Sequence, residues 1–481
     1  MSRHVFKTRF APSPTGRLHF GNIRTALFNW LLARRHGGVF LLRLEDTDAM
    51  RGHEKYATAL AEDLRWMGLG WDEGPGVGGA HSPYAQSERG DIYKGYFTRL
   101  EQQHLAYPCF CTEHELAVER KVAIASHLPP RYSGKCRTLS PDQIKAKFAT
   151  GLPATLRFRV PAARQVEFDD KVRGPQRFNS ADIGDFVIRR SDGTPAFFFC
   201  NAIDDALMQV TLVVRGEDHL TNTPRQILLL EALGLPAPEY AHIALVVDAN
   251  GTPLSKRTGS QSIEELRAAG FLPAALHNYL ARLGHTYEDN AFLSLETLAA
   301  GFAAERLHRA PARFDESQLL HWQKEAVHHA PSSELWEWMS GRNYTSEKGR
   351  IEDFVPKGSE LEFVDTIRGN IVLPIDAFLW AGNLYAQGDR YDEEAKALIR
   401  ATGSDFFGMA KQLLERETGE FKSYGRALAE VTGTKGKALY MPLRAALTGE
   451  THGPEMDRLW KLLGRERIKQ RLDNAFGLCK F

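Results

Sequence analysis

A chain of 481 residues is too long for one ordinary hydrophobic core, so we expect three to five domains. Its 43% hydrophobic and 25% charged residues exclude a disordered or fibrous protein. Sixty-one Lys and Arg residues against 60 Asp and Glu residues leave almost no net charge, so any nucleic-acid contact needs a local basic face.

Neither a membrane span nor an export signal is visible in the sequence. No apolar run approaches the roughly 18–20 residues that a span requires, and the polar N-terminus lacks the apolar core of a signal peptide. Five cysteines, a small and odd number, argue against a disulfide scaffold. We therefore expect a cytoplasmic protein without a membrane partner.

The beginning of the chain alternates strands and helices, as nucleotide-binding α/β domains do. Hydrophobic spacing predicts a strand at Val5–Phe10, a helix from Ile23 to a stop at Gly37, a strand at Val39–Glu45 and a helix at Glu54–Met67.

Residues 96–196 are punctuated by Pro and Gly and carry short strands such as Ala154–Val160, which predicts an insertion. The alternation then returns at Val210–Arg215, Thr223–Leu233 and Ile243–Val247. Beyond residue 256 helical patterns dominate, at Ile263–Ala269, Ala274–Leu283, Leu295–Ala303, Ala395–Leu414 (with a break at Gly403) and Met456–Leu472.

A loop between the first strand and helix reads RFAPSPTGRLHFGN, from Arg9 to Asn22. Free backbone N–H groups and the helix dipole make such a junction suited to phosphate. His19 can donate hydrogen bonds to phosphate, and Gly21 leaves room for a flat base on the backbone. An ordinary helix cap is the alternative for this loop alone.

A second loop, GTPLSKR at 251–257, follows the last predicted strand and precedes a helix. Lys256 and Arg257 there could stabilise charge on leaving phosphates, which is the main need of nucleotidyl transfer. A solvated loop is the alternative for so short a pattern.

The two loops together resemble the class I aminoacyl-tRNA synthetases of the bacterial glutamyl branch, and the resemblance covers nearly the whole chain. HFGN is similar to the HIGH motif, preceded by APSPTG, and LSKR is similar to the KMSKS loop. Asn22 stands where the family has its second histidine, and Pro253 where it has its first lysine. The family activates glutamate with ATP and Mg²⁺ and transfers it to tRNA, and the first step usually needs bound tRNA.

The resemblance implies an α/β Rossmann-like catalytic domain with an α+β insertion, followed by an all-α anticodon-binding region. The expected parts are the catalytic halves 1–95 and 197–250, an acceptor-binding insertion 96–196, a stem-contact domain 251–327 and an anticodon-binding region 328–481. The implied partners are tRNA(Glu), L-glutamate and ATP, and we expect a monomer.

The resemblance also assigns roles to individual residues. His19 and Lys256 are the catalytic candidates. ATP contacts fall on His19, Gly21, Asn22, Ser255, Lys256 and Arg257, and glutamate contacts on Arg9, Ser13, Glu45, Phe197, Asn201 and Arg215. Arginine forks suit the two carboxylates of glutamate, and a carboxylate suits its ammonium. Phe197 replaces a tyrosine of many relatives, and a buried ion pair is the alternative for Glu45 and Arg215.

Cys109, Cys111 and Cys136 form a partial zinc pattern of three thiols. Some relatives place a histidine at the position of Thr138, so the fourth ligand here could be Tyr132, His114 or His127. Three free cysteines left from a lost site are the alternative.

Near the C-terminus, Arg444, Arg465, Arg467, Lys469 and Arg471 could contact tRNA phosphates, although an ordinary basic helix face is the more frequent case. Discriminating members of the family read an anticodon base with an arginine, and Asn370 aligns with it here. Asparagine cannot make the same forked contact, so we hypothesise that tRNA(Gln) is charged beside tRNA(Glu), unless the nearby Arg368 restores the discrimination.

Two other functions remain open at this stage. A shortened relative glutamylates queuosine on tRNA but lacks an anticodon-binding region, and the helical C-terminus opposes that function. A tRNA-binding paralogue without catalysis is favoured only by Pro253 and Phe197.

Overall fold

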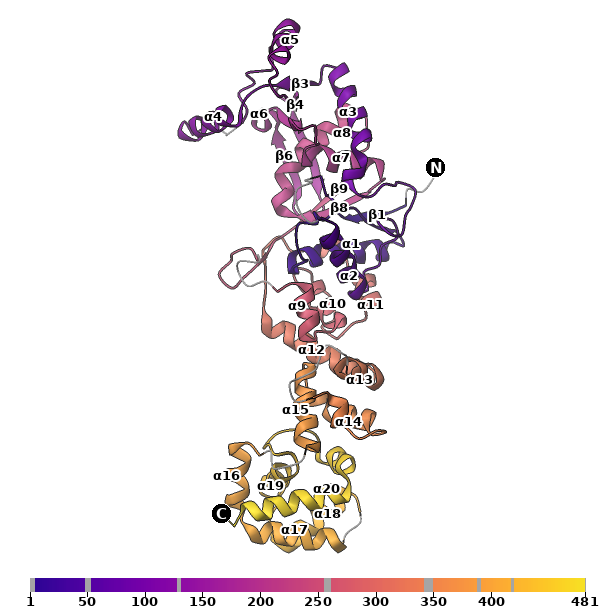
Figure 1. Cartoon of the computed structure of the whole chain (residues 1–481), viewed down its shortest axis with the longest axis vertical. Coiled ribbons are helices and arrows are strands. Elements are labelled where there is room, and N and C mark those ends of the chain that lie inside the picture. The colour runs from indigo at the N-terminus through magenta and orange to yellow at the C-terminus, as the bar shows by residue number, and fades with distance from the viewer. Residues whose placement is uncertain are drawn as a thin grey trace. The chain divides into compact units, whose positions relative to one another are not determined.

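The computed structural model describes residues 5–47, 53–127, 131–254, 261–340, 349–386, 391–416 and 419–480. The chain forms two compact units. The first comprises Met1–Leu266 and Leu276–Glu316, and the second Arg267–Ala275 and Ser317–Phe481. Figure 1 shows the strands gathered in the first unit and helices in the second. No described helix is long and apolar enough to cross a membrane.

The catalytic-type sheet in the first unit is built from parallel strands and helices that alternate along the chain. Its elements are β1 (Lys7–Phe10), α1 (Phe20–Arg35), β2 (Val39–Leu42), α2 (His53–Trp66), α7 (Phe197–Leu207), β8 (Leu212–Gly216), α8 (Thr223–Leu233) and β9 (Glu239–Ile243). β1 pairs in parallel with β2, and β8 with β9. The backbone N–H of Thr211 donates to the carbonyl of Lys7 (2.9 Å), which joins β8 to β1. This alternation confirms the α/β front half.

Gly38 permits the close approach of the chain segments that lead into β1 and β2. A Cβ atom at this position would overlap the backbone carbonyl of Phe6. The N–H of Val39 donates to that same carbonyl at 2.8 Å, so the glycine lets the first hydrogen bond of the parallel pair form.

Residues 90–189 form a smaller α+β body around a three-stranded antiparallel sheet, in the order β3-β4-β7. Its elements are α3 (Gly90–Gln102), β3 (Ala106–Cys109), α4 (Glu113–Ala125), α5 (Pro141–Ala149), β4 (Thr155–Phe158), β5 (Gln165–Asp170), β6 (Gly174–Asn179), α6 (Ser180–Ile183) and β7 (Phe186–Arg189). The β5–β6 hairpin leaves this body and extends the catalytic sheet, in the order β6-β5-β9-β8. Asp170 pairs with Tyr240 at that junction.

The predicted strand at Ile243–Val247 is interrupted at residues 244–245 and falls on the end of β9 and on β10 (Val246–Val247). β10 pairs with β11 (Ala312–Arg313) in a separate small sheet. The next helices along the chain are α9 (Ile263–Ala269), α10 (Pro273–Arg282) and α11 (Leu295–Gly301).

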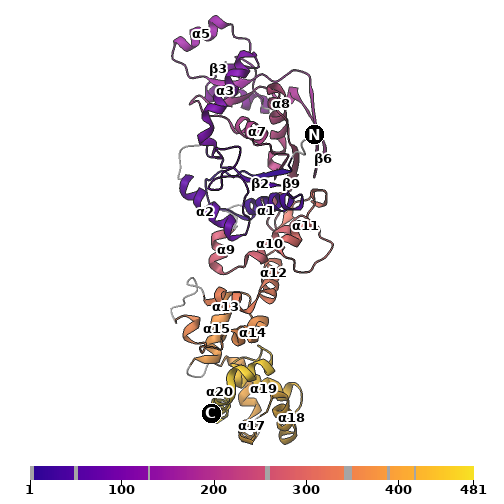
Figure 2. The same cartoon turned by 90° about the vertical axis from the view of Figure 1, so that its right-hand side faces the viewer.

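The second unit is helical throughout its described residues (Figure 2). It contains α12 (Glu316–His329), α13 (Ser332–Ser340), α14 (Glu360–Ile367), α15 (Pro374–Tyr385), α16 (Glu393–Thr402), α17 (Ser404–Arg416), α18 (Phe421–Thr432), α19 (Lys437–Thr448) and α20 (Met456–Leu478). Buried Phe363, Phe407 and Tyr424 belong to its core. The predicted break at Gly403 is confirmed, since Gly403 has φ of +87° between α16 and α17.

Candidate active site

A cavity of about 470 Å³ lies in the first unit, at the carboxyl ends of β1 and β8 and the start of α1. All of the predicted ATP-binding and glutamate-binding residues that the structure describes line this one cavity: Arg9, Ser13, His19, Gly21, Asn22, Glu45, Phe197, Asn201 and Arg215. Ligand sites of open α/β sheets lie at this edge, so the position of the cavity fits a nucleotide-binding domain.

The loop between β1 and α1 forms one wall of the cavity. Buried Pro12 accepts a 3.0 Å hydrogen bond at its carbonyl from the N–H of Glu45, which ties the loop to the end of β2. His19 is the N-cap residue of α1 in extended conformation, with the carbonyl accepting from Ile23 N–H. A Cβ atom added at Gly21 would meet no atom within 4 Å, so open space faces this first turn. The arrangement fits the predicted phosphate site.

Ser255, Lys256 and Arg257 lie outside the described residues, so their predicted roles stay predictions. Described residues on both sides of that segment lie near the cavity. Leu254 lines the cavity, and Ser262 forms a β-bridge with His19, the N-cap residue of α1.

The residues predicted to bind glutamate rest on a buried cluster of opposite charges. Arg9 donates to Asp205 through Nε (3.1 Å to Oδ1), and Arg43 donates to the same Oδ1 at 2.7 Å. Arg43 also reaches Glu45 Oε1 at 3.3 Å, and Asn201 donates to that oxygen. Burial would raise the pKa of Asp205, but the two arginines outweigh it and lower the pKa. Asp205 therefore stays ionised and holds Arg9 in place.

For Glu45, which belongs to the same cluster, burial has a larger effect on the pKa than the neighbouring arginines have. Burial raises the pKa of Glu45 above its usual range, against the opposite effects of Arg43 and Arg9. The side chain faces the cavity, so an ammonium group bound there would add a favourable charge and keep the carboxylate ionised.

A second buried carboxylate, Asp204, supports this cluster from behind. It accepts hydrogen bonds from Arg89 Nε (2.7 Å), Gln86 Nε2 (2.8 Å) and the Tyr93 hydroxyl (2.7 Å). α7 thus carries Asn201 towards the cavity and two carboxylates into the layer beneath it, which fixes the helix that lines the site.

Arg215 differs from Arg9 in that all of its hydrogen bonds within the described residues are to neutral groups. Its Nη2 donates to Thr223 Oγ1 (2.8 Å) and Gln226 Oε1 (2.7 Å), and its Nε to His242 Nε2 (3.1 Å). Nη1 is buried and has no hydrogen-bond partner within the described residues. Burial lowers the pKa of Arg215 to about 10, so the guanidinium remains cationic at neutral pH. A buried cation without a carboxylate partner can receive a carboxylate of a ligand.

Phe197 and Ser13 complete the predicted set. Phe197 is half-buried and stacks on His219, with ring centroids 5.4 Å apart. Burial lowers the pKa of His219. Ser13 is exposed at the mouth of the cavity, and its carbonyl accepts from Thr15 N–H at 2.8 Å.

The three predicted thiols come together in the first unit. The sulfur atoms of Cys109, Cys111 and Cys136 lie within 4.8 Å of one another. Tyr132 Oη lies 3.4 Å from Cys109 Sγ and 3.6 Å from Cys111 Sγ, and accepts from Cys136 N–H at 2.8 Å. Among the described residues no histidine belongs to the cluster, and His114 and His127 are exposed.

Asn370 is exposed and lines a cavity of about 760 Å³ in the second unit, with Arg368, Arg458 and Lys461. The Arg368 guanidinium is engaged within its own unit. It donates to the carbonyls of His328 and Ala330 (both 3.3 Å) and to Asp365 Oδ1 (2.9 Å).

The predicted phosphate-contacting arginines of the C-terminal helices also bind carbonyl groups. Arg444 donates to Pro454 O, Arg465 to Glu415 O (3.0 Å) and Arg471 to Asn383 O. These three side chains therefore fit an ordinary basic helix face better than they fit a set of side chains that are free to contact phosphate.

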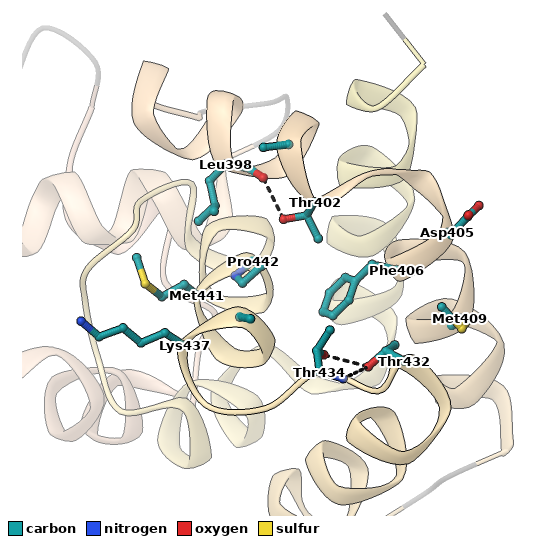
Figure 3. A pocket seen from close by; sticks show the side chains of 12 residues that line it. Leu398, Thr402, Asp405, Phe406, Met409, Thr432, Thr434, Lys437, Met441 and Pro442 are labelled. Atoms are coloured by element: carbon teal, nitrogen blue, oxygen red, sulfur yellow. Dashed lines mark hydrogen bonds between the residues drawn. The ribbon is translucent and has the colours of Figure 1, made fainter.

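A further cavity, of about 600 Å³, opens among α16–α19 (Figure 3). Phe406 and Pro442 face it from two helices, Thr402 donates to Leu398 O beside it, and Lys437 is its single cation. The sequence analysis did not identify this cavity, because its lining is an ordinary apolar pattern.

The residues that sequence reasoning missed in the main site are Arg43, Asp204 and Asp205. A signal for them existed, since each is a charged residue inside a strongly apolar stretch, LLRLE and FFFCNAIDDALM. A charge in such a stretch needs a buried partner.

Comparisons with known proteins agree with this geometry. Residues 5–321 match the family of class I tRNA synthetases (E and Q), catalytic domain, and residues 375–476 match an anticodon binding domain. The chain is 54% identical to a glutamate–tRNA ligase 2 of Nitrosococcus oceani, covering 99% of both chains. It is 52% identical to a glutamate–tRNA ligase 2 of Alkalilimnicola ehrlichii, covering 98% of both.

A solved glutamate tRNA ligase from Elizabethkingia meningosepticum, in complex with its amino acid, superposes with a TM-score of 0.85. It is 29% identical to this chain, and the match covers 98% of this chain and 99% of the other.

Proposed function

Because the chain belongs to the class I tRNA synthetases for glutamate and glutamine, we propose that the main cavity activates glutamate with ATP and passes it to tRNA. The activity is that of a glutamate–tRNA ligase, and the family uses ATP with Mg²⁺. The observation that carries the proposal is the convergence of nine predicted residues on one cavity.

The first step joins glutamate to adenylate. An α-carboxylate oxygen of glutamate attacks the α-phosphorus of ATP, and pyrophosphate leaves. We assign His19, Gly21 and Asn22 to ATP, because they form the phosphate-facing start of α1. Ser255, Lys256 and Arg257 are assigned to the leaving pyrophosphate. In the second step a terminal ribose hydroxyl of tRNA attacks the acyl carbon, and AMP leaves.

The residues of the glutamate pocket are assigned by matching their charges to those of glutamate. Arg215 and Arg9 supply cations for the two carboxylates, and Glu45 supplies the anion for the ammonium, beside Ser13 and Asn201. Phe197 contributes an apolar wall. Arg215 is the strongest of these assignments, because its Nη1 is buried without a partner within the described residues.

Glutamate-dependent pyrophosphate exchange tests this function. Wild-type protein should exchange pyrophosphate with glutamate in the presence of tRNA, and Lys256→Ala should be slower by about 10²–10³-fold, the effect of losing one preorganised charge-stabilising donor. A non-catalytic paralogue would show no exchange. A queuosine-modifying enzyme would exchange without tRNA and fail to charge tRNA(Glu). The relatives of full length disfavour both.

We further propose that the cysteine cluster binds a structural zinc ion through Cys109, Cys111, Cys136 and Tyr132. Structural zinc takes four ligands in a tetrahedron. Three thiols within 4.8 Å of one another and one phenol oxygen in contact with them match that set in number and kind. The interpretation as three free cysteines explains the thiols but not the phenol at their centre.

The proposal also extends to tRNA selectivity: tRNA(Gln) is charged beside tRNA(Glu). Support comes from the second unit, where the alternative reader, Arg368, has its guanidinium engaged by two carbonyls and Asp365. Asn370 is exposed in the same cavity, with a short uncharged side chain that makes no forked contact.

A further inference from the structure

Arg215 is held by a chain of buried polar groups that begins outside the glutamate pocket. Asp170 at the end of β5 and His242 on β9 are 3% and 0% exposed. His242 Nδ1 lies 2.6 Å from Asp170 Oδ2, and His242 Nε2 lies 3.1 Å from Arg215 Nε. Neither residue lines the cavity, so neither touches substrate.

The hydrogen-bond directions in this chain are fixed by chemistry. An arginine Nε always carries a proton, so His242 Nε2 must accept. Nδ1 then carries the ring proton and donates to Asp170, which selects this tautomer. Burial lowers the pKa of His242 and keeps the ring neutral, as an acceptor must be.

Asp170 is itself held in one orientation. Its Oδ1 accepts from the backbone N–H groups of Val172 (3.0 Å) and Arg173 (2.8 Å). Its Oδ2 faces the His242 ring and also accepts from the backbone N–H of His242 at 3.1 Å. The carboxylate therefore cannot rotate without breaking backbone hydrogen bonds, and it presents an acceptor to His242 Nδ1.

The remaining contacts of Arg215 leave one direction open. Nη2 is used by Thr223 and Gln226, Nε is used by His242, and Nη1 alone has no partner within the described residues. We propose that Asp170 and His242 are positioning residues that fix the Arg215 guanidinium with Nη1 directed at a glutamate carboxylate. This inference rests on the proposed contact between Arg215 and glutamate.

Two substitutions of His242 test its contact with Arg215 separately from its contact with Asp170. His242→Gln keeps an acceptor in the place of Nε2, whereas His242→Asn is too short to reach Arg215. In steady-state aminoacylation by the full chain, we expect His242→Asn to raise the KM for glutamate about ten-fold and His242→Gln less than about three-fold. The KM for ATP should stay unchanged in both.

Asp170→Asn tests the tautomer with almost no change of shape. Its amide oxygen must stay on the backbone N–H groups, so its NH₂ faces His242 Nδ1 and forces a proton onto Nε2, against the Arg215 N–H. We expect a rise of about ten-fold in glutamate KM, and no further rise when Asp170→Asn is added to His242→Gln.

His277→Gln is the control, since His277 is another buried histidine of the first unit that does not line the cavity. It should lower Tm and leave glutamate KM unchanged. Two results would overturn the positioning role. One is that Asp170→Asn raises glutamate KM equally in the wild-type and the His242→Gln protein. The other is that His242→Gln raises glutamate KM as much as His242→Asn does. If Arg215→Ala leaves glutamate KM unchanged, the proposed glutamate contact itself fails.

Discussion

At the scale of single residues, the tyrosine among the three cysteines has the clearest chemical consequence. Tyr132 Oη accepts from Cys136 N–H and lies within 3.6 Å of the sulfur atoms of Cys109 and Cys111. The Arg157 guanidinium lies over its ring at 3.9 Å. Burial and the neighbouring thiols raise the pKa of the phenol, so the ionised form needs a bound cation. Burial raises the pKa of the Cys111 thiol to about 12, so this thiol stays protonated at neutral pH unless a cation binds beside it.

The zinc prediction can be tested on two ligands. Protein purified without added metal should contain one zinc per chain by elemental analysis. Cys136→Ser should lose the zinc, because it removes a thiolate. Tyr132→Phe should keep the fold and bind zinc more weakly, measured by competition with a chelator, since only the phenol oxygen is removed. Well-folded, active protein without zinc would contradict the site.

The sequence predicted the cavity-lining residues but not the residues that hold them. Arg9, Glu45 and Arg215 sit in loop and strand-end motifs that a family resemblance reveals. Asp205, which positions Arg9, is 196 positions away in the chain, and only the packed fold shows the pair. Their proposed roles remain predictions.

At the scale of secondary-structure elements, α10 and α2 are joined by a buried histidine. His277 on α10 is 6% exposed and its Nε2 lies 2.6 Å from the carbonyl of Met67, just beyond the end of α2. The contact satisfies a carbonyl that the helix leaves free. Burial lowers the pKa of His277 to about 4.

This contact predicts a pH dependence of stability. The histidine pKa is about 6.5 in the unfolded chain and about 4 in the folded protein. Between these pH values only the unfolded chain binds the proton. The free energy of unfolding is therefore highest above pH 6.5 and falls as the pH drops from 6.5 to 4. The loss amounts to about 3 kcal/mol for one such group. His277→Gln keeps a donor but does not titrate. In denaturant unfolding, the free energy of unfolding of the wild type should exceed that of His277→Gln at pH 7, and the difference should shrink towards pH 4. If the two proteins lose stability in parallel as the pH falls, the prediction is wrong.

Elements were predicted better than their pairing. The helices that the spacing predicted lie near their observed bounds, including the break at Gly403. Other helices were not predicted, among them α7 and α12 to α15. It could not show that β5 and β6, within the predicted insertion, extend the sheet of β8 and β9. Local periodicity contains no information on which strands meet. The helix α18 was also missed, although it buries Tyr424.

At the scale of the whole molecule, amino-acid chemistry and anticodon reading belong to different units. The cavity proposed to bind glutamate lies within the first unit, and residues 375–476 of the second match an anticodon binding domain. A substitution in the second unit should therefore be able to change the choice of tRNA without changing the proposed glutamate pocket.

Charging purified tRNA(Glu) and tRNA(Gln) side by side tests relaxed selectivity. Wild-type protein should charge both, and Asn370→Arg should raise the preference for tRNA(Glu) by about ten-fold or more, the scale of one forked base contact, with glutamate KM unchanged. Asn370→Gln is the matched control, since it keeps a neutral amide and should leave the preference unchanged. A wild-type preference of several decades would reject the hypothesis.

The pairing of β1 with β8 has a consequence for how the chain folds during synthesis. β1 is made first, but its hydrogen bonds to Thr211 and the ion pair of Arg9 with Asp205 involve residues about two hundred positions later. At a synthesis rate of roughly 5–20 residues per second, this edge of β1 stays without its partner strand β8 for about 10–40 seconds. The proposed amino-acid pocket therefore cannot form before residues near Arg215 have been synthesised. Until then the nascent chain must keep the unpaired edge of β1 from pairing with other strands.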